Sequence, residues 1–156
     1  MEYSFLPVDL RNKEHCSQLI RLLDAYMQDD MGNAAPMPAE LVPRILSGLK
    51  NYAGYLGFFA VVDGEFAALA NCNKNFSSFK AKLLINIHDF VVHPDFRGKG
   101  VGRFLLDAIA DFGKQNGYCR INLEVRHDNI NAQKLYKKAG YDECQPAMYF
   151  WEKQLS

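Results

Sequence analysis

Glycine and basic residues alternate in one short segment, "HPDFRGKGVG", at positions 93–102. An apolar pattern typical of a helix follows at once in "RFLLDAIADF". Glycine permits positive φ and lets a ligand approach the backbone closely. The start of a helix adds unpaired N–H groups and the positive end of its dipole, so the segment predicts a site for an anion such as a phosphate. The residues expected to form this site are Arg97, Gly98, Lys99, Gly100, Val101, Gly102 and Arg103.

The spacing of the glycines excludes two common phosphate loops. Gly98-x-Gly100-x-Gly102 is not the G-x-G-x-x-G of dinucleotide-binding folds, and the segment lacks the G-K-[ST] of a P-loop. It also has no Ser or Thr to hold the magnesium ion of a nucleotide. A tight turn that leads into a helix needs glycine too, so the spacing alone allows either a ligand site or a structural turn.

Strand and helix patterns on both sides of the segment show how it would be positioned. Residues 83–92 are rich in β-branched residues and predict a strand, and an apolar stripe over 101–112 predicts a helix that ends at Asn116-Gly117. Asp63-Gly64 between two apolar runs predicts a hairpin. We expect one domain over residues 1–156, with a mixed α/β sheet covered by helices. The other predicted strands are 3–10, 118–125 and 147–155, and the other predicted helices are 14–28, 38–50 and 129–140.

Two motifs in the expected order resemble the GCN5-related N-acetyltransferases, the GNAT superfamily. "VVHPDFRGKGVGRFLL" is similar to the pyrophosphate motif of that family, Arg97-x-x-Gly100-x-Gly102 after an apolar strand. "LEVRHDNINAQKLYKKAGYDE" is similar to its fifth strand and fourth helix, so the likeness covers about residues 83–143. It implies a GNAT fold, with a central mixed sheet of about six to seven strands and four helices.

The resemblance also implies a site for acetyl-CoA where the fourth and fifth strands diverge. The amides of residues 97–102 would hold the pyrophosphate, and Asn129 would contact the coenzyme. Lys137 belongs to a basic cluster that could meet the 3′-phosphate, or could be part of a solvated helix face. The pantetheine arm would pair with the strand at Phe90, Val91 and Val92, and an amide at or near Val91 would donate to the thioester oxygen.

Acetyl transfer to an amine needs a group that protonates the departing thiolate. Asn129 and Tyr136 fall on one helical face, so the phenol would point toward the coenzyme. A phenol has a pKa of about 10, so it stays protonated at neutral pH and can donate to the sulfur. Tyr136 is therefore the candidate acid, and its alternative role is to fill the helix–sheet interface.

The amine must also lose a proton before it attacks. His88 is the candidate base because an imidazole titrates near neutrality, and Asp89 is the alternative base or the binder of a cationic acceptor. Strict alternation places His88 on the face of Phe90, and Asp89 on the face of Ile87 and Val91, unless a bulge interrupts the strand.

Net charge, cysteine spacing and hydropathy indicate which classes of partner and which location to expect. Net charge is +0, hydrophobic residues make up 49% and charged residues 23%, so no broad basic surface for nucleic acid is expected. The cysteines form no CxxC pair, and no metal site is indicated. No signal peptide or membrane-spanning run is present, so a cytoplasmic location is expected.

The prediction is an N-acetyltransferase that moves acetyl from acetyl-CoA to a primary amine of a small molecule, directly in a ternary complex. Alternatives are a transferase of longer acyl groups and an acyl-CoA-binding sensor or partner-complex subunit without activity. A homodimer through the apolar C-terminal strand is a further expectation.

Overall fold

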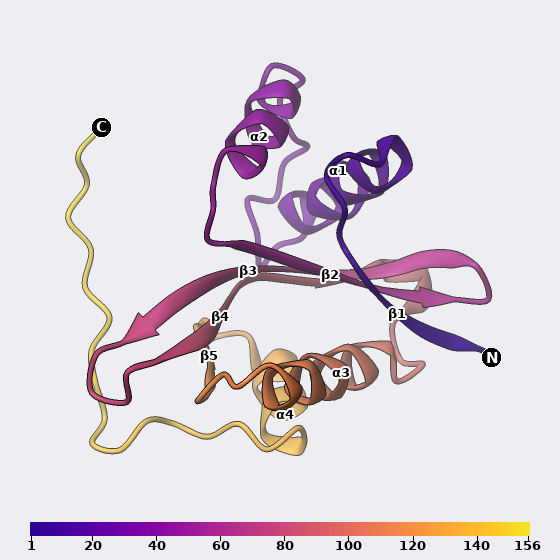
Figure 1. Ribbon diagram of the computed structural model, residues 1–156. Coiled ribbons are helices and arrows are strands. Elements are labelled where there is room, and N and C mark those ends of the chain that lie inside the picture. Colours follow the sequence, from indigo (N-terminus) through magenta and orange to yellow (C-terminus); the bar gives the residue numbers. More distant parts are fainter.

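The computed structural model describes residues 1–156 and contains one five-stranded sheet in the order β1-β2-β3-β4-β5. Four α-helices cover it, two on each face (Figure 1). A short 3₁₀ turn, Pro94–Phe96, connects β4 to the glycine segment. In chain order the elements are β1 Tyr3–Pro7, α1 Lys13–Gln28, α2 Leu41–Lys50, β2 Tyr55–Val62, β3 Glu65–Ser77, β4 Lys82–Val92, α3 Val101–Gln115, β5 Ile121–Leu123 and α4 Ile130–Lys138.

The sheet is antiparallel from β1 to β4, and β4 and β5 pair in parallel. The hairpin predicted at Asp63-Gly64 is confirmed, and the two residues have φ values of 49° and 83°. Positive φ at both central residues matches the twist of the flanking strands. β3 continues past the apolar run of the hairpin to Ser77, so only a short turn separates it from β4.

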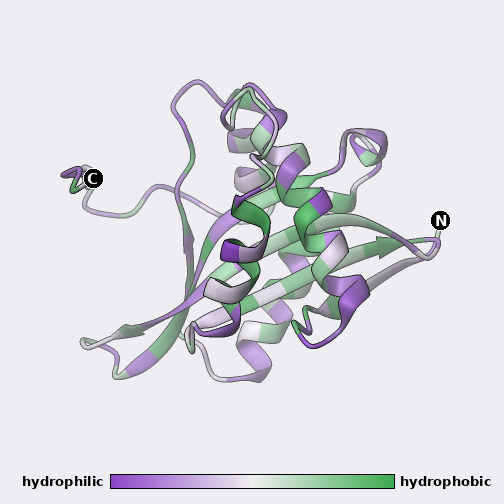
Figure 2. Ribbon diagram, turned by 90° about the horizontal axis from the view of Figure 1, so that it is seen from above, coloured by the Kyte–Doolittle hydropathy of each residue, from purple (hydrophilic) through white to green (hydrophobic).

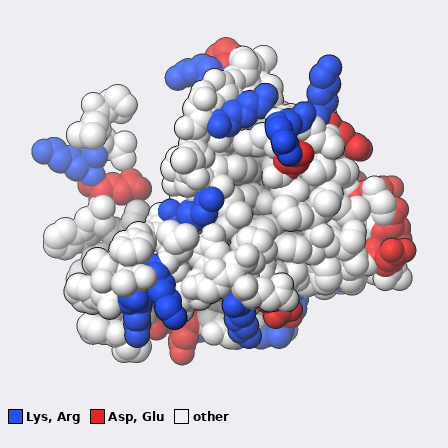
Figure 3. Space-filling model, in the orientation of Figure 1, with Lys and Arg blue, Asp and Glu red and all other residues white.

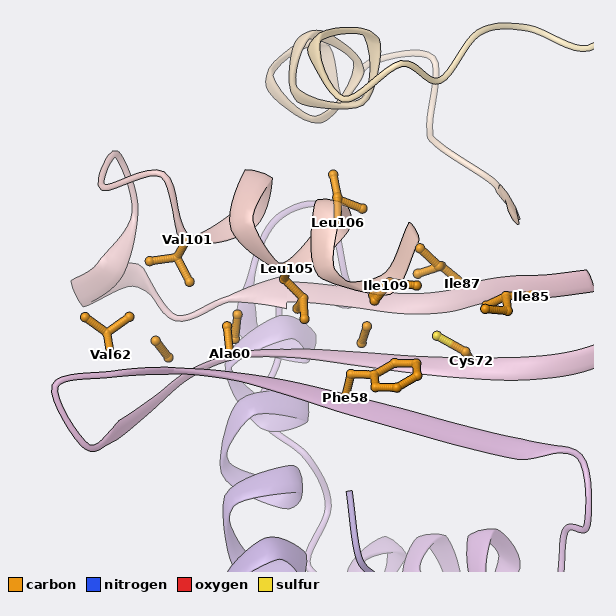
Figure 4. Packing of buried hydrophobic residues seen from close by; sticks show 13 residues of the cluster. Phe58, Ala60, Val62, Cys72, Ile85, Ile87, Val101, Leu105, Leu106 and Ile109 are labelled. Atoms are coloured by element: carbon orange, nitrogen blue, oxygen red, sulfur yellow. The ribbon is translucent and has the colours of Figure 1, made fainter. Parts of the chain in front are cut away.

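Two apolar clusters hold the helices on the sheet. Under one face, Phe58, Ile85 and Ile87 of the strands pack against Leu105 and Ile109 of α3 (Figure 4). On the other face, Leu19 and Leu22 of α1 pack against Phe59, Leu69 and Val91. Figure 2 shows hydrophobic and hydrophilic residues alternating along the helices, as expected for helices with one buried side. Packing on both faces therefore fixes the sheet, and the glycine loop follows the end of its strand β4.

Leu106 shows why α3 carries more apolar residues than the predicted stripe. It is 1% exposed and points away from the sheet, toward α4, while Val101 and Leu105 point toward the sheet (Figure 4). α3 therefore packs between the sheet and α4. The apolar stripe in the sequence predicted its contact with the sheet but not its contact with α4.

Two predictions about strands are wrong. The sheet has five strands, not six to seven, because residues 147–155 pair with nothing and remain extended. Strand 118–125 is confirmed only as Ile121–Leu123, since pairing with β4 stops there. Residues 147–155 and the two ends of 118–125 therefore do not join the sheet as strands, although β5 keeps one unpaired edge.

The charged side chains do not form one broad basic surface on the face drawn in Figure 3, where Lys and Arg are dispersed among neutral and acidic residues. None of the helices is both long and apolar enough to cross a membrane.

Candidate active site

The glycine segment forms the turn between β4 and α3. Gly98 and Gly100 have φ values of 75° and 77°, a backbone conformation that side chains rarely adopt. No atom outside the chain neighbours lies within 4 Å of a Cβ built on either residue, so the ligand side of the turn is open. Gly102 differs, because its Cβ would lie 3.0 Å from Cδ2 of Leu135. Two glycines thus shape the loop, and the third lets α4 approach α3.

The backbone N–H groups from Gly98 to Arg103 donate to no protein acceptor, and the first helical hydrogen bond of α3 is from Phe104 N–H to the carbonyl of Gly100, at 3.0 Å. A run of free amides at the positive end of a helix has the donors and the charge that suit an anion.

The basic side chains of the loop contact protein groups, so the free donors are mainly backbone. Arg97 Nε donates to the carbonyl of Val92 at 3.2 Å, and its Nη2 lies 2.9 Å from Oδ2 of Asp29. Lys99 Nζ lies 5.5 Å from the ring centre of Phe96. Arg103 makes an exposed ion pair along α3 with Asp107. These contacts fix the loop and leave its amides facing outward.

An opening in the sheet begins beside this loop. The β4–β5 pairing ends at Ile87 and Leu123, although β4 continues to Val92. His93 N–H donates to the carbonyl of Ala67 on β3, so by alternation the Val91 backbone also faces β3. The backbone groups of Phe90 and Val92 therefore face the opening, and a linear ligand can pair with them there.

Tyr136 lies on α4 below this opening. Its ring meets Phe90 edge-on, with centroids 6.1 Å apart and an interplanar angle of 72°. Burial and, to a smaller extent, the neighbouring Tyr26 raise the pKa of Tyr136 to about 12. The hydroxyl donates to no protein group. Tyr136 is thus a protonated donor at neutral pH.

Asn129 and Lys137 lie at opposite ends of α4. The side-chain oxygen of Asn129 accepts from Ala132 N–H at 3.2 Å, so this residue is the N-cap of the helix and only its amide nitrogen remains free. Lys137 is exposed in the last turn.

The residues proposed as base lie at an irregularity of β4. Asn71 and Cys72 of β3 pair with Asp89 and Ile87, so His88 has no partner across the ladder. This β-bulge makes the predicted alternation wrong at one point, because Ile87 packs with the α3 face whereas Asp89 lies on the α1 face with Val91. His88 itself is exposed.

A hydrogen-bond chain that the sequence analysis missed orients Asp89. The hydroxyl of Tyr55 donates to Oδ1 of Asn71 at 2.7 Å, and Nδ2 of Asn71 donates to Oδ2 of Asp89 at 3.1 Å. Asn71 is 5% exposed, so the chain crosses the sheet interior. The one signal in the sequence was a polar residue inside the apolar run "ALANC".

Tyr26 and the α1–α2 connection form the upper wall. Burial raises the pKa of Tyr26, and the charges of Asp89 and Asp29 raise it further, whereas Arg126 lowers it, so these groups lie near one another. Arg126 Nη1 donates to the carbonyl of Asp30 at 3.4 Å. With the Arg97–Asp29 pair, this contact attaches the connection to both sides of the opening.

No group of His, Cys, Asp and Glu side chains is arranged to hold a metal ion. Two shallow hollows lie elsewhere on the surface, one at the β3–β4 turn and one between α1 and the β2–β3 turn. The second hollow also reaches His93, Asp95 and Phe96 before the glycine loop, and neither hollow includes Phe90, Val92 or residues 97–103.

The profile of the Acetyltransferase (GNAT) family matches residues 19–141 of this chain. The chain belongs to the GNAT family. The matched residues include the glycine loop, the opening of the sheet and Tyr136, so the resemblance and the mixed α/β GNAT fold are confirmed.

Curated relatives of this GNAT chain match over part of their length. The uncharacterized N-acetyltransferase YhfO of Bacillus subtilis is 35% identical over 95 residues, 61% of this chain and 63% of the relative. Streptothricin acetyltransferase of Streptomyces lavendulae is 36% identical over 88 residues, 56% of this chain and 44% of the relative. The alanine N-acetyltransferase of ribosomal protein bS18 of Escherichia coli is 34% identical over 90 residues, 58% of this chain and 57% of the relative. The aligned part of the chain thus spans 44% to 63% of these relatives.

Solved structures show the fold over the whole chain. A probable acetyltransferase superposes with a TM-score of 0.82 at 20% identity, covering 100% of this chain and 99% of that chain. AAC(6')-Iy in complex with the bisubstrate analog CoA-S-monomethyl-acetylneamine gives a TM-score of 0.74 at 16% identity, covering 99% and 100%.

Proposed function

We propose that this GNAT protein is an N-acetyltransferase that moves acetyl from acetyl-CoA to the primary amine of a small molecule. The observation that carries the proposal is the run of free amides from Gly98 to Arg103, next to the unpaired edge of β4. The amides suit a diphosphate, and the edge suits the amide groups of a pantetheine arm. The two features are adjacent along the chain, as the parts of one coenzyme require.

The transfer itself needs three groups. The amine nitrogen attacks the thioester carbon, the carbon–sulfur bond breaks, and the thiolate takes the proton of the Tyr136 hydroxyl. A β4 amide at Phe90 or Val92 donates to the thioester oxygen as charge develops on it. Asp89 or His88 takes one proton from the ammonium before the attack. The nitrogen loses its second proton as the tetrahedral intermediate collapses, and a proton from solvent restores the Tyr136 hydroxyl.

Asp89 has the firmer support as the residue that receives or binds the amine. Asn71 fixes its carboxylate, and the carboxylate acts on Tyr26 at the wall of the opening. His88 lies at the bulge and is exposed. Comparing Asp89→Asn with His88→Gln separates the two roles. A large loss of kcat in the first variant alone assigns the base to Asp89, and the reverse assigns it to His88.

A small acceptor is favoured by the way the opening is covered. The α1–α2 connection is attached to Arg97 through Asp29 and to Arg126 through Asp30, and a covered opening suits a small molecule better than a folded protein surface. The relatives include one named for streptothricin and one named for a ribosomal protein, so names alone favour neither acceptor class.

Two measurements test the proposal. Acetyl-CoA is expected to raise the melting temperature, whereas ATP and NAD are not, because the loop lacks their motifs. Release of the CoA thiol is then measured with a panel of small amines and with peptides. Binding of acetyl-CoA without thiol release for any acceptor supports the alternative of a sensor without activity. Faster thiol release from longer acyl-CoA molecules supports the alternative of a transferase of longer acyl groups. No stabilisation by any acyl-CoA contradicts the proposal.

A further inference from the structure

Tyr3, near the start of the chain, is hydrogen-bonded to the glycine loop. Its hydroxyl donates to the carbonyl of Lys99, in the middle of the loop, across 96 positions of sequence. Figure 1 shows β1 running beside the turn that leads into α3. No other side chain donates to a carbonyl of residues 98–102. Tyr3 is therefore the side chain that attaches the backbone of the loop to the sheet.

Tyr3 is itself held in place by its strand and by α3. It pairs with Val62 of β2 in the antiparallel ladder. Beyond the ladder, Glu2 N–H donates to Oδ1 of Asp63 at 2.8 Å, and Asp63 N–H donates to the carbonyl of Glu2 at 2.9 Å. The ring of Tyr3 packs against Phe104 near the start of α3, with centroids 5.4 Å apart. The hydroxyl thus reaches the loop from a strand that is fixed on both sides of Tyr3.

The hydrogen bond from Tyr3 sets the direction of one loop amide. The carbonyl of Lys99 and the N–H of Gly100 belong to the same peptide group, which is trans. The two groups of a trans peptide point in opposite directions, so a carbonyl held toward β1 turns the Gly100 N–H away from β1. That N–H has no protein acceptor, whereas the carbonyl of Gly100 accepts from Phe104 N–H at 3.0 Å. Donation to the carbonyl also polarises the peptide and makes its N–H a stronger donor.

We propose that Tyr3 is a positioning residue for the coenzyme, and that its hydroxyl orients the Lys99–Gly100 peptide so that the Gly100 N–H donates to the diphosphate. The inference rests on the proposed function, which assigns the diphosphate of acetyl-CoA to this loop. Glycines on both sides of Lys99 let the peptide rotate easily, so a contact from outside the loop is needed to hold it. A donor that is already oriented binds more tightly, because its ordering no longer costs binding free energy.

Acetyl-CoA affinity, measured by calorimetry, tests the role of the hydroxyl. Tyr3→Phe keeps the ring that packs on Phe104 and removes only the donor. It should weaken acetyl-CoA binding by about threefold to tenfold, the range expected for one hydrogen bond.

Phe5→Leu is the matched control for this measurement. Phe5 lies two residues along β1 and stacks on Phe58 of β2, with ring centroids 4.9 Å apart. The variant should lower the free energy of unfolding and leave acetyl-CoA affinity unchanged. Equal affinity in Tyr3→Phe and the unchanged chain overturns the proposal, as does an equal loss of affinity in Phe5→Leu.

The NMR signal of the Gly100 amide tests the direction of the peptide. Acetyl-CoA should move the amide proton downfield in the unchanged chain, because the N–H gains a charged acceptor. S-acetyl-pantetheine lacks the diphosphate and should leave the signal in place, and Tyr3→Phe should reduce the shift that acetyl-CoA causes. A Gly100 signal that acetyl-CoA does not move in the unchanged chain overturns the proposal, whether or not Tyr3→Phe folds.

The two measurements also separate this inference from the proposed function. If acetyl-CoA does not bind the unchanged chain, the proposed function fails and the role of Tyr3 fails with it. If acetyl-CoA binds but neither the Gly100 signal nor the affinity of Tyr3→Phe responds, the proposed function stands and the role of Tyr3 alone is wrong.

Discussion

Arg97 of the glycine loop and Asp29 at the C-terminal end of α1 form an ion pair at 2.9 Å across the mouth of the site. The two residues are far apart in the sequence, since Asp29 caps α1 and Arg97 lies in the loop between β4 and α3. Arg97 also donates to the carbonyl of Val92, so one side chain connects the loop, the end of β4 and α1. The loop is thus fixed before any ligand arrives.

Asp29→Asn should lower stability by about 0.5–1 kcal/mol at neutral pH, since the pair is partly exposed. The backbone N–H of Met31 and then Arg97 lower the pKa of Asp29 below its ordinary value. A lowered folded-state pKa contributes stability above the unfolded pKa of about 4, and the contribution is lost as pH falls through the folded value. Urea unfolding of both proteins from pH 7 to pH 3 should therefore show the difference shrinking below about pH 4.

Asp107→Asn is the control for that measurement. Asp107 pairs with Arg103 within one helix and joins no separate elements. Its substitution should change the free energy of unfolding by at most about 0.5 kcal/mol. An Asp29 variant whose deficit persists unchanged at pH 3 would show that the charge is not responsible.

Gly100→Ala should weaken acetyl-CoA binding by about tenfold or more, because a methyl group would occupy the open side of the loop. Gly117→Ala is the matched control, since both glycines have a φ of 77° and lie at opposite ends of α3. Each variant should lose about 1 kcal/mol of stability from the left-handed backbone. Calorimetric titration should find weaker acetyl-CoA binding for Gly100→Ala alone. An equal loss of acetyl-CoA affinity in both variants would show that the loop does not bind the coenzyme.

Asn71→Ala should reduce turnover, because it frees the carboxylate of Asp89 from its donor and leaves the Tyr55 hydroxyl unpaired. We expect a fall in kcat of about tenfold and a stability loss of about 1–3 kcal/mol. Asn73→Ala also removes a β3–β4 side-chain hydrogen bond, but one that ends at Asn86 and not at the site. Steady-state kinetics should show an unchanged kcat for Asn73→Ala. If kcat falls equally in Asn73→Ala and Asn71→Ala, the effect of Asn71 is structural and does not act through Asp89.

Tyr136→Phe should lower kcat by roughly 10²-fold or more while coenzyme affinity stays nearly constant. The pKa of Tyr136 is raised to about 12, so its hydroxyl remains protonated and should cause no loss of kcat up to about pH 10.

Tyr141→Phe provides the comparison, since this neighbouring ring lies 6.0 Å from Tyr136 and burial likewise raises its pKa to about 12. The Tyr141 hydroxyl is buried without a hydrogen-bond partner, so removing it should preserve turnover and raise stability by up to about 1 kcal/mol. Equal kcat in Tyr136→Phe and the unchanged chain would exclude the acid role.

The alternation rule failed at one place, between Ile87 and Asp89. The extra residue of the bulge, His88, moves Asp89 to the face of α1 and brings it to Asn71. Nothing in the run "INIHDFVV" marks a bulge, because its position depends on how β4 aligns with β3. The same register decides that Phe90 and Val92 present their backbones to the opening.

The sequence by itself determined the local elements and the residue types of the loop. Periodicity gave the helices, Asp63-Gly64 gave the hairpin, and the glycines gave the turn between β4 and α3, because each depends on residues close together in the chain. Only the tertiary structure decided which distant groups meet. The Arg97–Asp29 pair, the Tyr55–Asn71–Asp89 chain and the unpaired tail all depend on strand register and on available partner edges, which a one-dimensional pattern does not specify.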